Sequence, residues 1–254
     1  MKVTTKNVLK RCVFMAFIIV LITVVFSIIV KYYVEGESSL PYSLEKILIV
    51  SSVSTSNNED AENLWNISLE EDNDIYLYIT KTDEDSSETI QSITLENFQI
   101  IKTPTIGEII VYRPTGDLGT NLYEYSEQNY LDSSITYTGA SVDTLKTLEV
   151  RNEGGTIGFR VSLENLGNYV SNNYDEEVVY DGNLLTKAGI SLEDIQVSMS
   201  FDILITLNNN VTFKGTINLD LPNDDIITNP ESNTEITDFS DVVFKRIWKK
   251  YWKK

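Results

Sequence analysis

The chain has 254 residues, 42% hydrophobic and 23% charged, and a formal net charge of −18. This composition is typical of a globular protein and not of a disordered or repetitive chain, and the length allows one sizeable domain with its own core. The chain contains no histidine and one cysteine. These absences exclude Ser-His-Asp and Cys-His catalysis, thiol redox chemistry and the usual zinc sites.

The charges are strongly segregated. Five of the 20 basic residues precede residue 32 and six lie in 245–254, so residues 32–244 hold nine basic against all 38 acidic residues, a formal charge of −29. Such an acidic region repels nucleic acid and anionic lipid. We therefore expect no nucleic-acid partner, whereas the two basic ends favour contact with anionic surfaces.

Residues 12–30 predict a transmembrane helix. They contain nineteen residues without a charge, and a helix of this length spans roughly 28 Å, close to the ~30 Å hydrocarbon core of a bilayer. Lys2, Lys6, Lys10 and Arg11 precede this stretch, while only Lys31 follows it before the acidic region. The positive-inside rule then predicts residues 1–11 as a cytoplasmic basic tail and the rest of a single-pass cell-membrane protein as extracytoplasmic.

A cleaved signal peptide is the alternative, with 34–36 as the cleavage motif, although the apolar run exceeds the ~7 to 15 residues usual for a signal. Cys12 is interpreted as a small apolar residue at the inner interface, with lipidation as the alternative. The predicted extracytoplasmic region contains no cysteine and so cannot form an internal disulfide. This feature, in a chain rich in Ile, Asn and Tyr, associates the protein with a bacterial cell envelope.

Residues 31–44 predict a polar juxtamembrane linker, and residues 45–238 an extracytoplasmic β-rich domain. Apolar and polar residues alternate in 197–207 and 211–221, as half-buried strands require, and Asn208-Asn209-Asn210 between them predicts a hairpin loop. In 89–102 the apolar phase changes near Asn97, which indicates a bulge. The same alternation marks further strands at Ile75/Leu77/Ile79, Ile109/Val111, Ile135/Tyr137 and Ile157/Phe159/Val161/Leu163.

Helices are scarce in this domain. Short ones are expected between Asn183 and Gly189 and between Ser191 and Asp194, where residues suited to helix caps occur. Many short strands without βαβ alternation predict a mainly β fold, an antiparallel β-sandwich, with a barrel-like arrangement as the alternative.

Residues 239–254 predict a short amphipathic C-terminal helix, because apolar pairs alternate with basic pairs. Trp and Tyr opposite Lys and Arg are typical of helices that lie on a membrane surface. The alternatives are a last strand over 242–247 with a solubilising tail, and electrostatic binding of 243–254 to an anionic wall polymer or a partner protein. The predicted membrane-binding residues are Phe244, Lys245, Arg246, Ile247, Trp248, Lys249, Lys250, Tyr251, Trp252, Lys253 and Lys254.

Acidic clusters occur at 70–74, 83–85, 175–177 and 224–225. We interpret them as solvated turns; calcium binding is a weak alternative, since no cluster matches the EF-hand pattern. No cofactor and no catalytic residue are predicted, and no spacing singles out a glycosidase pair. Arg160, on the polar face of its strand, is expected to be an internal charge partner, as are Arg113 and Arg151.

These observations favour a membrane-anchored, non-enzymatic binding or scaffolding domain of the cell envelope, with an unidentified envelope protein as partner. Two alternatives stay open: a carboxylate-dependent hydrolase acting on envelope glycans, and a signalling or regulatory subunit of a membrane complex.

Overall fold

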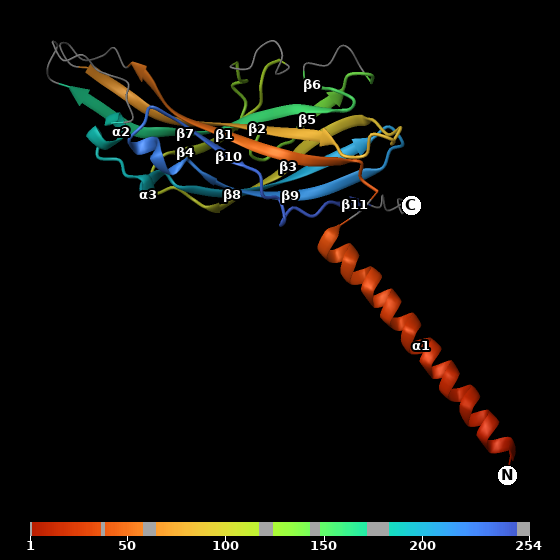
Figure 1. Cartoon of the computed structure of the whole chain (residues 1–254). Helices are drawn as coiled ribbons and strands as arrows, with labels where there is room; N and C mark the ends of the chain where they lie inside the picture. The colour runs from red at the N-terminus through yellow and green to blue at the C-terminus, as the bar shows by residue number, and fades with distance from the viewer. Residues whose placement is uncertain are drawn as a thin grey trace, which may run out of the picture.

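The computed structural model describes residues 2–36, 39–57, 65–116, 124–142, 148–171 and 183–247. One long N-terminal helix precedes two β-sheets that pack face to face (Figure 1). Both sheets keep open edges in the described part of the chain, so the sandwich prediction is confirmed over the barrel.

The two sheets have five and six strands. Neighbouring strands are antiparallel except β5 and β6, which are parallel. Sheet A has the order β10 (Glu231–Ile236), β1 (Tyr42–Asn57), β2 (Trp65–Lys81), β7 (Gly154–Ser171), β4 (Glu108–Tyr112). Sheet B has the order β11 (Lys245–Ile247), β9 (Thr212–Leu221), β8 (Val197–Leu207), β3 (Ile90–Lys102), β5 (Ile135–Gly139), β6 (Glu149–Val150).

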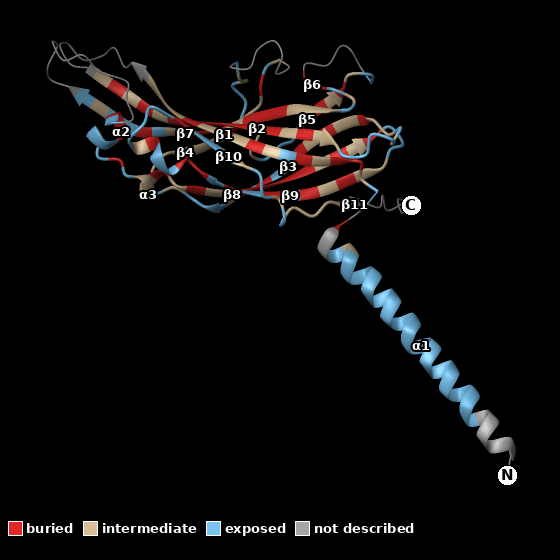
Figure 2. Cartoon of the chain, in the orientation of Figure 1, coloured by how far each residue is buried: buried red, intermediate tan, exposed pale blue. Residues whose placement is uncertain are grey.

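Helix α1 (Lys2–Glu35) projects away from one end of the sandwich, and its described side chains are almost all exposed (Figure 2). Its segment Val8–Tyr33 is long and apolar enough to cross a membrane, a test that a signal sequence near the N-terminus also passes. The helix continues past residue 30, and β1 begins at Tyr42. The connection is therefore shorter than the linker predicted over 31–44.

The core lies between the sheets and consists of the inward-facing residues of nearly every strand. At its centre Phe98, Phe159 and Phe201 form an aromatic cluster, with ring centroids 5.1 to 5.7 Å apart. Phe98 reaches this cluster because β3 changes register against β8 between Glu96 and Gln99, where Asn97 adopts a positive φ of 56°. The bulge predicted near Asn97 is confirmed.

The predicted hairpin is also confirmed, since β8 and β9 pair along their full lengths. The chain reverses through Asn208-Asn209-Asn210, and Asn210 has a φ of 63°, which asparagine tolerates better than most residues. The two short helices form as expected, α2 over Asn183–Lys187 and α3 over Leu192–Ile195, the latter with a capping box between Ser191 and Asp194. A single 3₁₀ turn, η1 (Asp224–Ile227), follows β9.

The amphipathic helix predicted for 239–254 is wrong over its described part. Residues 245–247 form β11, and the residues before it are turn or irregular. Of the alternative strand over 242–247, residues 245–247 are confirmed. The edge of β9 is otherwise unpaired, and pairing with it satisfies backbone groups of β11 that a short helix would leave free at its ends. Residues 248–254 lie outside the described residues.

Candidate functional site

The acidic run at 70–74 lies inside strand β2, so the interpretation of these residues as a solvated turn is wrong. The strand starts at Trp65, ten residues before its first predicted apolar position. Its inward positions continue in alternation through Glu71 and Asn73, and both are fully buried between the sheets. Residues 83–85 are exposed, as predicted, and residues 175–177 lie outside the described residues.

On the outer face of sheet A, Asp72 and Asp74 meet two residues of the neighbouring strand. Strand register places Asp74 opposite Arg160 and Asp72 opposite Ser162. Arg160 donates through Nε and Nη2 to the two carboxylate oxygens of Asp74, at 2.7 and 2.9 Å, and through Nη1 to Asp72 at 3.1 Å. The expectation that Arg160 is an internal charge partner is confirmed.

The segment after β4 passes over this ion-paired group. Pro114 and Tyr125 form an isolated bridge. The Tyr125 ring lies 4.3 Å from the Arg160 guanidinium, and its hydroxyl donates to Asp74 at 2.8 Å. This cover leaves both aspartates less than a tenth exposed although they face away from the core. Arg160 is thus held on three sides, by two carboxylates and an aromatic ring.

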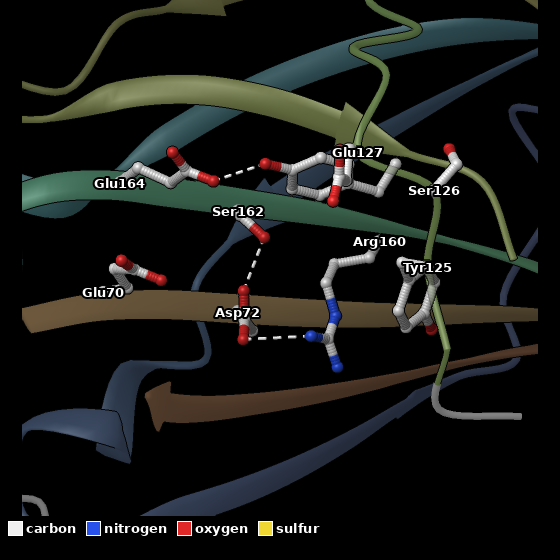
Figure 3. A pocket seen from close by; sticks show the side chains of 9 residues that line it. Glu70, Asp72, Tyr125, Ser126, Glu127, Arg160, Ser162 and Glu164 are labelled. Atoms are coloured by element: carbon white, nitrogen blue, oxygen red, sulfur yellow. Dashed lines mark hydrogen bonds and ion pairs between the residues drawn. The ribbon is translucent and has the colours of Figure 1, made fainter. Parts of the chain in front are cut away.

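Beside Arg160 the outer face is hollowed into a depression of about 270 Å³ (Figure 3). Its lining residues come from β2, from β7, from the end of β4 and from the segment after β4. Four of the nine lining residues are acidic, and Arg160 is the one lysine or arginine among them. The lining consists of Glu70, Asp72, Tyr112, Tyr125, Ser126, Glu127, Arg160, Ser162 and Glu164.

The electrostatics of the depression favour positive charge. Partial burial, with Glu164 and Asp72 nearby, raises the pKa of Glu70 above its usual value. Burial and the bond that its hydroxyl donates to Glu164 raise the pKa of Tyr112 as well, so Tyr112 stays a proton donor. Because Arg160 is already neutralised by two aspartates, Glu70, Glu127 and Glu164 keep the depression negative.

A second polar group lies on the opposite, inward side of β2. Ser51 donates to Asn73 at 2.7 Å, and Asn73 Nδ2 donates to Glu71 Oε2 at 2.7 Å. The backbone N–H of Asn223 donates to Ser51. The other oxygen of Glu71 is buried without a hydrogen-bond partner in the described part of the chain. Burial raises the pKa of Glu71 well above its usual range and so favours the neutral carboxyl in the folded protein.

The predicted membrane-binding residues are placed only in part. Phe244 packs on β9, and Lys245, Arg246 and Ile247 form β11. Trp248, Lys249, Lys250, Tyr251, Trp252, Lys253 and Lys254 lie outside the described residues. Within the described ranges, no group of three or more Asp, Glu or Cys side chains is arranged to hold a metal ion.

A scan of protein-family models, a search of curated proteins and a search of solved structures each found no match. The depression is therefore interpreted from its own residues. Two features of the sequence indicate the site. The alternation of inward-facing positions extends from Ile75 back to residue 71, and one arginine lies on the polar face of β7. Neither signal identifies which strands are neighbours.

Proposed function

We propose that this protein is a membrane-anchored extracytoplasmic binding domain whose outer-face depression binds a positively charged group of a cell-envelope component. In this proposal α1 stays in the membrane as an uncleaved anchor, residues 1–11 are cytoplasmic, and the β-sandwich lies outside. The activity is binding without catalysis.

The observation that carries the proposal is the charge balance of the depression. Glu70 and Glu164 line it without a salt bridge to Arg160, which is bound to Asp72 and Asp74. A protonated amine in the depression would supply the positive charge that balances Glu70 and Glu164. Tyr112 and Tyr125 add aromatic surface beside the amine. The strongly acidic domain also raises the local concentration of cationic ligands.

The test uses the full chain in neutral detergent micelles and N-acetyl-lysine methylamide as the amine probe, followed by ligand-observed NMR. The norleucine analogue, which has the same chain length without the ammonium, is the ligand control. Glu70→Gln and Glu164→Gln are each expected to weaken binding about five-fold, a loss of ~1 kcal/mol. Glu96→Gln on β3 of sheet B makes the same charge change away from the depression and is expected to leave binding unchanged.

Equal binding of the lysine and norleucine probes would show that charge does not select the ligand. Equal loss in Glu70→Gln and Glu96→Gln would mean that the amine responds only to the overall charge of the domain. Either result contradicts the proposed site.

One observation favours a second candidate, a carboxylate-dependent glycan hydrolase. Glu70, whose pKa is raised, lies near Asp72, which accepts hydrogen bonds from Arg160 and Ser162. Acid–base cleavage of a glycosidic bond uses two carboxyl groups in one depression, one that donates a proton and one that stays ionised. New reducing ends released from purified wall glycan by the full chain, and abolished by Glu70→Gln, would establish this activity in place of simple binding.

A further inference from the structure

The hydrogen-bond donors around the depression are already used within the protein. The Ser162 hydroxyl donates to Asp72, and the Tyr125 hydroxyl donates to Asp74. Arg160 donates to the same two carboxylates through Nε, Nη1 and Nη2. Figure 3 shows the bonds that Asp72 accepts from Arg160 and Ser162. These side chains therefore have few N–H or O–H groups left for a ligand.

Hydrogen-bond acceptors, by contrast, are in excess in the depression. The side chains of Glu70 and Glu127 make no hydrogen bond and no ion pair within the described part of the chain. Tyr112 donates to one oxygen of Glu164, and an ionised carboxylate can accept several more bonds. The Ser126 hydroxyl has no partner among the described residues, but its oxygen is buried. A ligand that satisfies the depression must therefore bring hydrogen-bond donors of its own.

The aromatic surface of the depression is small. Tyr112 and Tyr125 are the two aromatic residues in its described lining. The Arg160 guanidinium lies over the Tyr125 ring, 4.3 Å from its centre, so this ring already binds a cation of the protein. A quaternary ammonium has no N–H to donate and is held by a cage of aromatic faces. The depression offers no such cage in its described lining, which instead favours a cation that donates hydrogen bonds.

A primary ammonium has the donors that this lining requires. It carries three N–H groups, and N–H···O bonds to a carboxylate bring its nitrogen to about 2.8 Å from the oxygen. Methyl groups on the nitrogen remove these donors and hold the charge further from the oxygens, which weakens the attraction. Burial and the nearby charge of Glu164 raise the pKa of Glu70, so the two carboxyl groups lie close to each other. We therefore expect one ammonium to contact both.

The charges around the depression also limit what a ligand can carry beside its amine. Asp72 and Asp74 balance the charge of Arg160, the one lysine or arginine of the described lining. A phosphate or carboxylate on the ligand would therefore meet acidic side chains without a counter-charge. A zwitterionic headgroup such as phosphoethanolamine places its phosphate among these acids, whereas an amine on an uncharged chain avoids this repulsion.

We propose that the depression selects a primary ammonium on an uncharged chain, the group that a lysine side chain of an envelope peptide presents. Glu70 and Glu164 accept hydrogen bonds from its N–H groups and so distinguish it from a methylated ammonium. This inference rests on the proposed binding function and adds the chemical class of the ligand. The source of the amine is then a peptide and not a lipid headgroup.

The test measures the dissociation constants of three ammonium compounds for the full chain in non-ionic detergent by ligand-observed NMR. The probes are N-acetyl-lysine methylamide, its Nε-trimethyl analogue and phosphoethanolamine, and the norleucine analogue is the uncharged reference. The lysine probe is expected to bind at least about ten-fold more tightly than either of the other two. In Glu70→Gln the preference for lysine over its trimethyl analogue should fall about three-fold. The matched variant Glu96→Gln on β3 should keep the full preference.

Equal binding of the lysine probe and its trimethyl analogue, both tighter than norleucine, would overturn this inference and leave the binding of positive charge intact. Tighter binding of phosphoethanolamine than of the lysine probe would also overturn it, because a lipid headgroup is then the preferred ligand. An unchanged preference in Glu70→Gln would overturn the assignment of the selectivity to Glu70. A lysine probe that binds no more tightly than norleucine contradicts the proposed function, and this inference with it.

Discussion

Replacing Glu71 by glutamine is expected to stabilise the β domain, and to do so increasingly as the pH rises. Glu71 is fully buried, with one oxygen accepting from Asn73 and the other without a partner in the described chain. Glutamine has nearly the same shape, and its carbonyl oxygen accepts the same bond from Asn73. The substitution therefore removes the titrating proton while the packing stays the same.

The sign and the size follow from proton linkage. Below the ordinary pKa of 4.5, Glu71 is protonated in both the folded and the unfolded chain, and it contributes no pH dependence. Above that pH the unfolded chain releases the proton while burial keeps it on the folded one. The free energy of unfolding then falls by about 1.4 kcal/mol for each pH unit until the folded-state pKa is reached. The advantage of Glu71→Gln therefore grows with pH across this range.

The assay is urea unfolding of the full chain in neutral detergent, followed by the circular dichroism of the β domain at several pH values. Other titrating groups cancel when the wild-type value is subtracted from the variant value at each pH. Glu45→Gln, an exposed change on neighbouring strand β1, is the control and should give a flat difference. A flat or falling difference for Glu71→Gln would mean that Glu71 is ionised in the folded protein, and the argument from burial would be refuted.

Three substitutions test other parts of the structure by the same unfolding assay. Burial raises the pKa of Asp202, but hydrogen bonds from Lys214, Thr216 and Asn97 outweigh it and hold this pKa below its usual range. Asp202→Asn should lower the free energy of unfolding by about 2 kcal/mol at neutral pH, and this loss should disappear as the pH falls through the folded-state pKa. Arg160→Met should lower the free energy of unfolding by about 3 kcal/mol, because the buried carboxylates of Asp72 and Asp74 lose their counter-charge. Converting both aspartates to asparagine in the same chain should recover most of this loss. Asn210→Val should lower the free energy of unfolding by about 1 to 2 kcal/mol because of its positive φ, whereas Asn210→Gly should change it little.

Local sequence signals predicted the parts of the fold that depend on neighbouring residues. The β8–β9 hairpin follows from two alternating runs around three asparagines, and the bulge at Asn97 from a change of apolar phase. The predicted C-terminal helix shows the limit of such signals. A pattern of paired apolar and basic residues fits a helix. Residues 245–247 instead pair with the open edge of β9, and this pairing cannot be predicted from the residues of the segment alone.

The candidate site depends on contacts between strands that are distant in sequence. Asp74 and Arg160 are 86 residues apart and meet only because β2 and β7 are neighbours in a particular register. The charge composition of residues 70–74 alone favours a solvated turn over a strand. Its burial is possible because Arg160 neutralises the outward carboxylates and because burial raises the pKa of the inward Glu71, which favours its neutral form.

The most direct test of the account is protease accessibility on intact cells that express the chain with a different tag at each end. We predict that protease digests the C-terminal tag while the N-terminal tag stays protected on a membrane-bound fragment that contains α1. Opening the cells should then expose the N-terminal tag. A C-terminal tag that stays protected until the cells are opened, or a shortened protein released from the membrane without its N-terminal tag, would contradict the anchored extracytoplasmic domain.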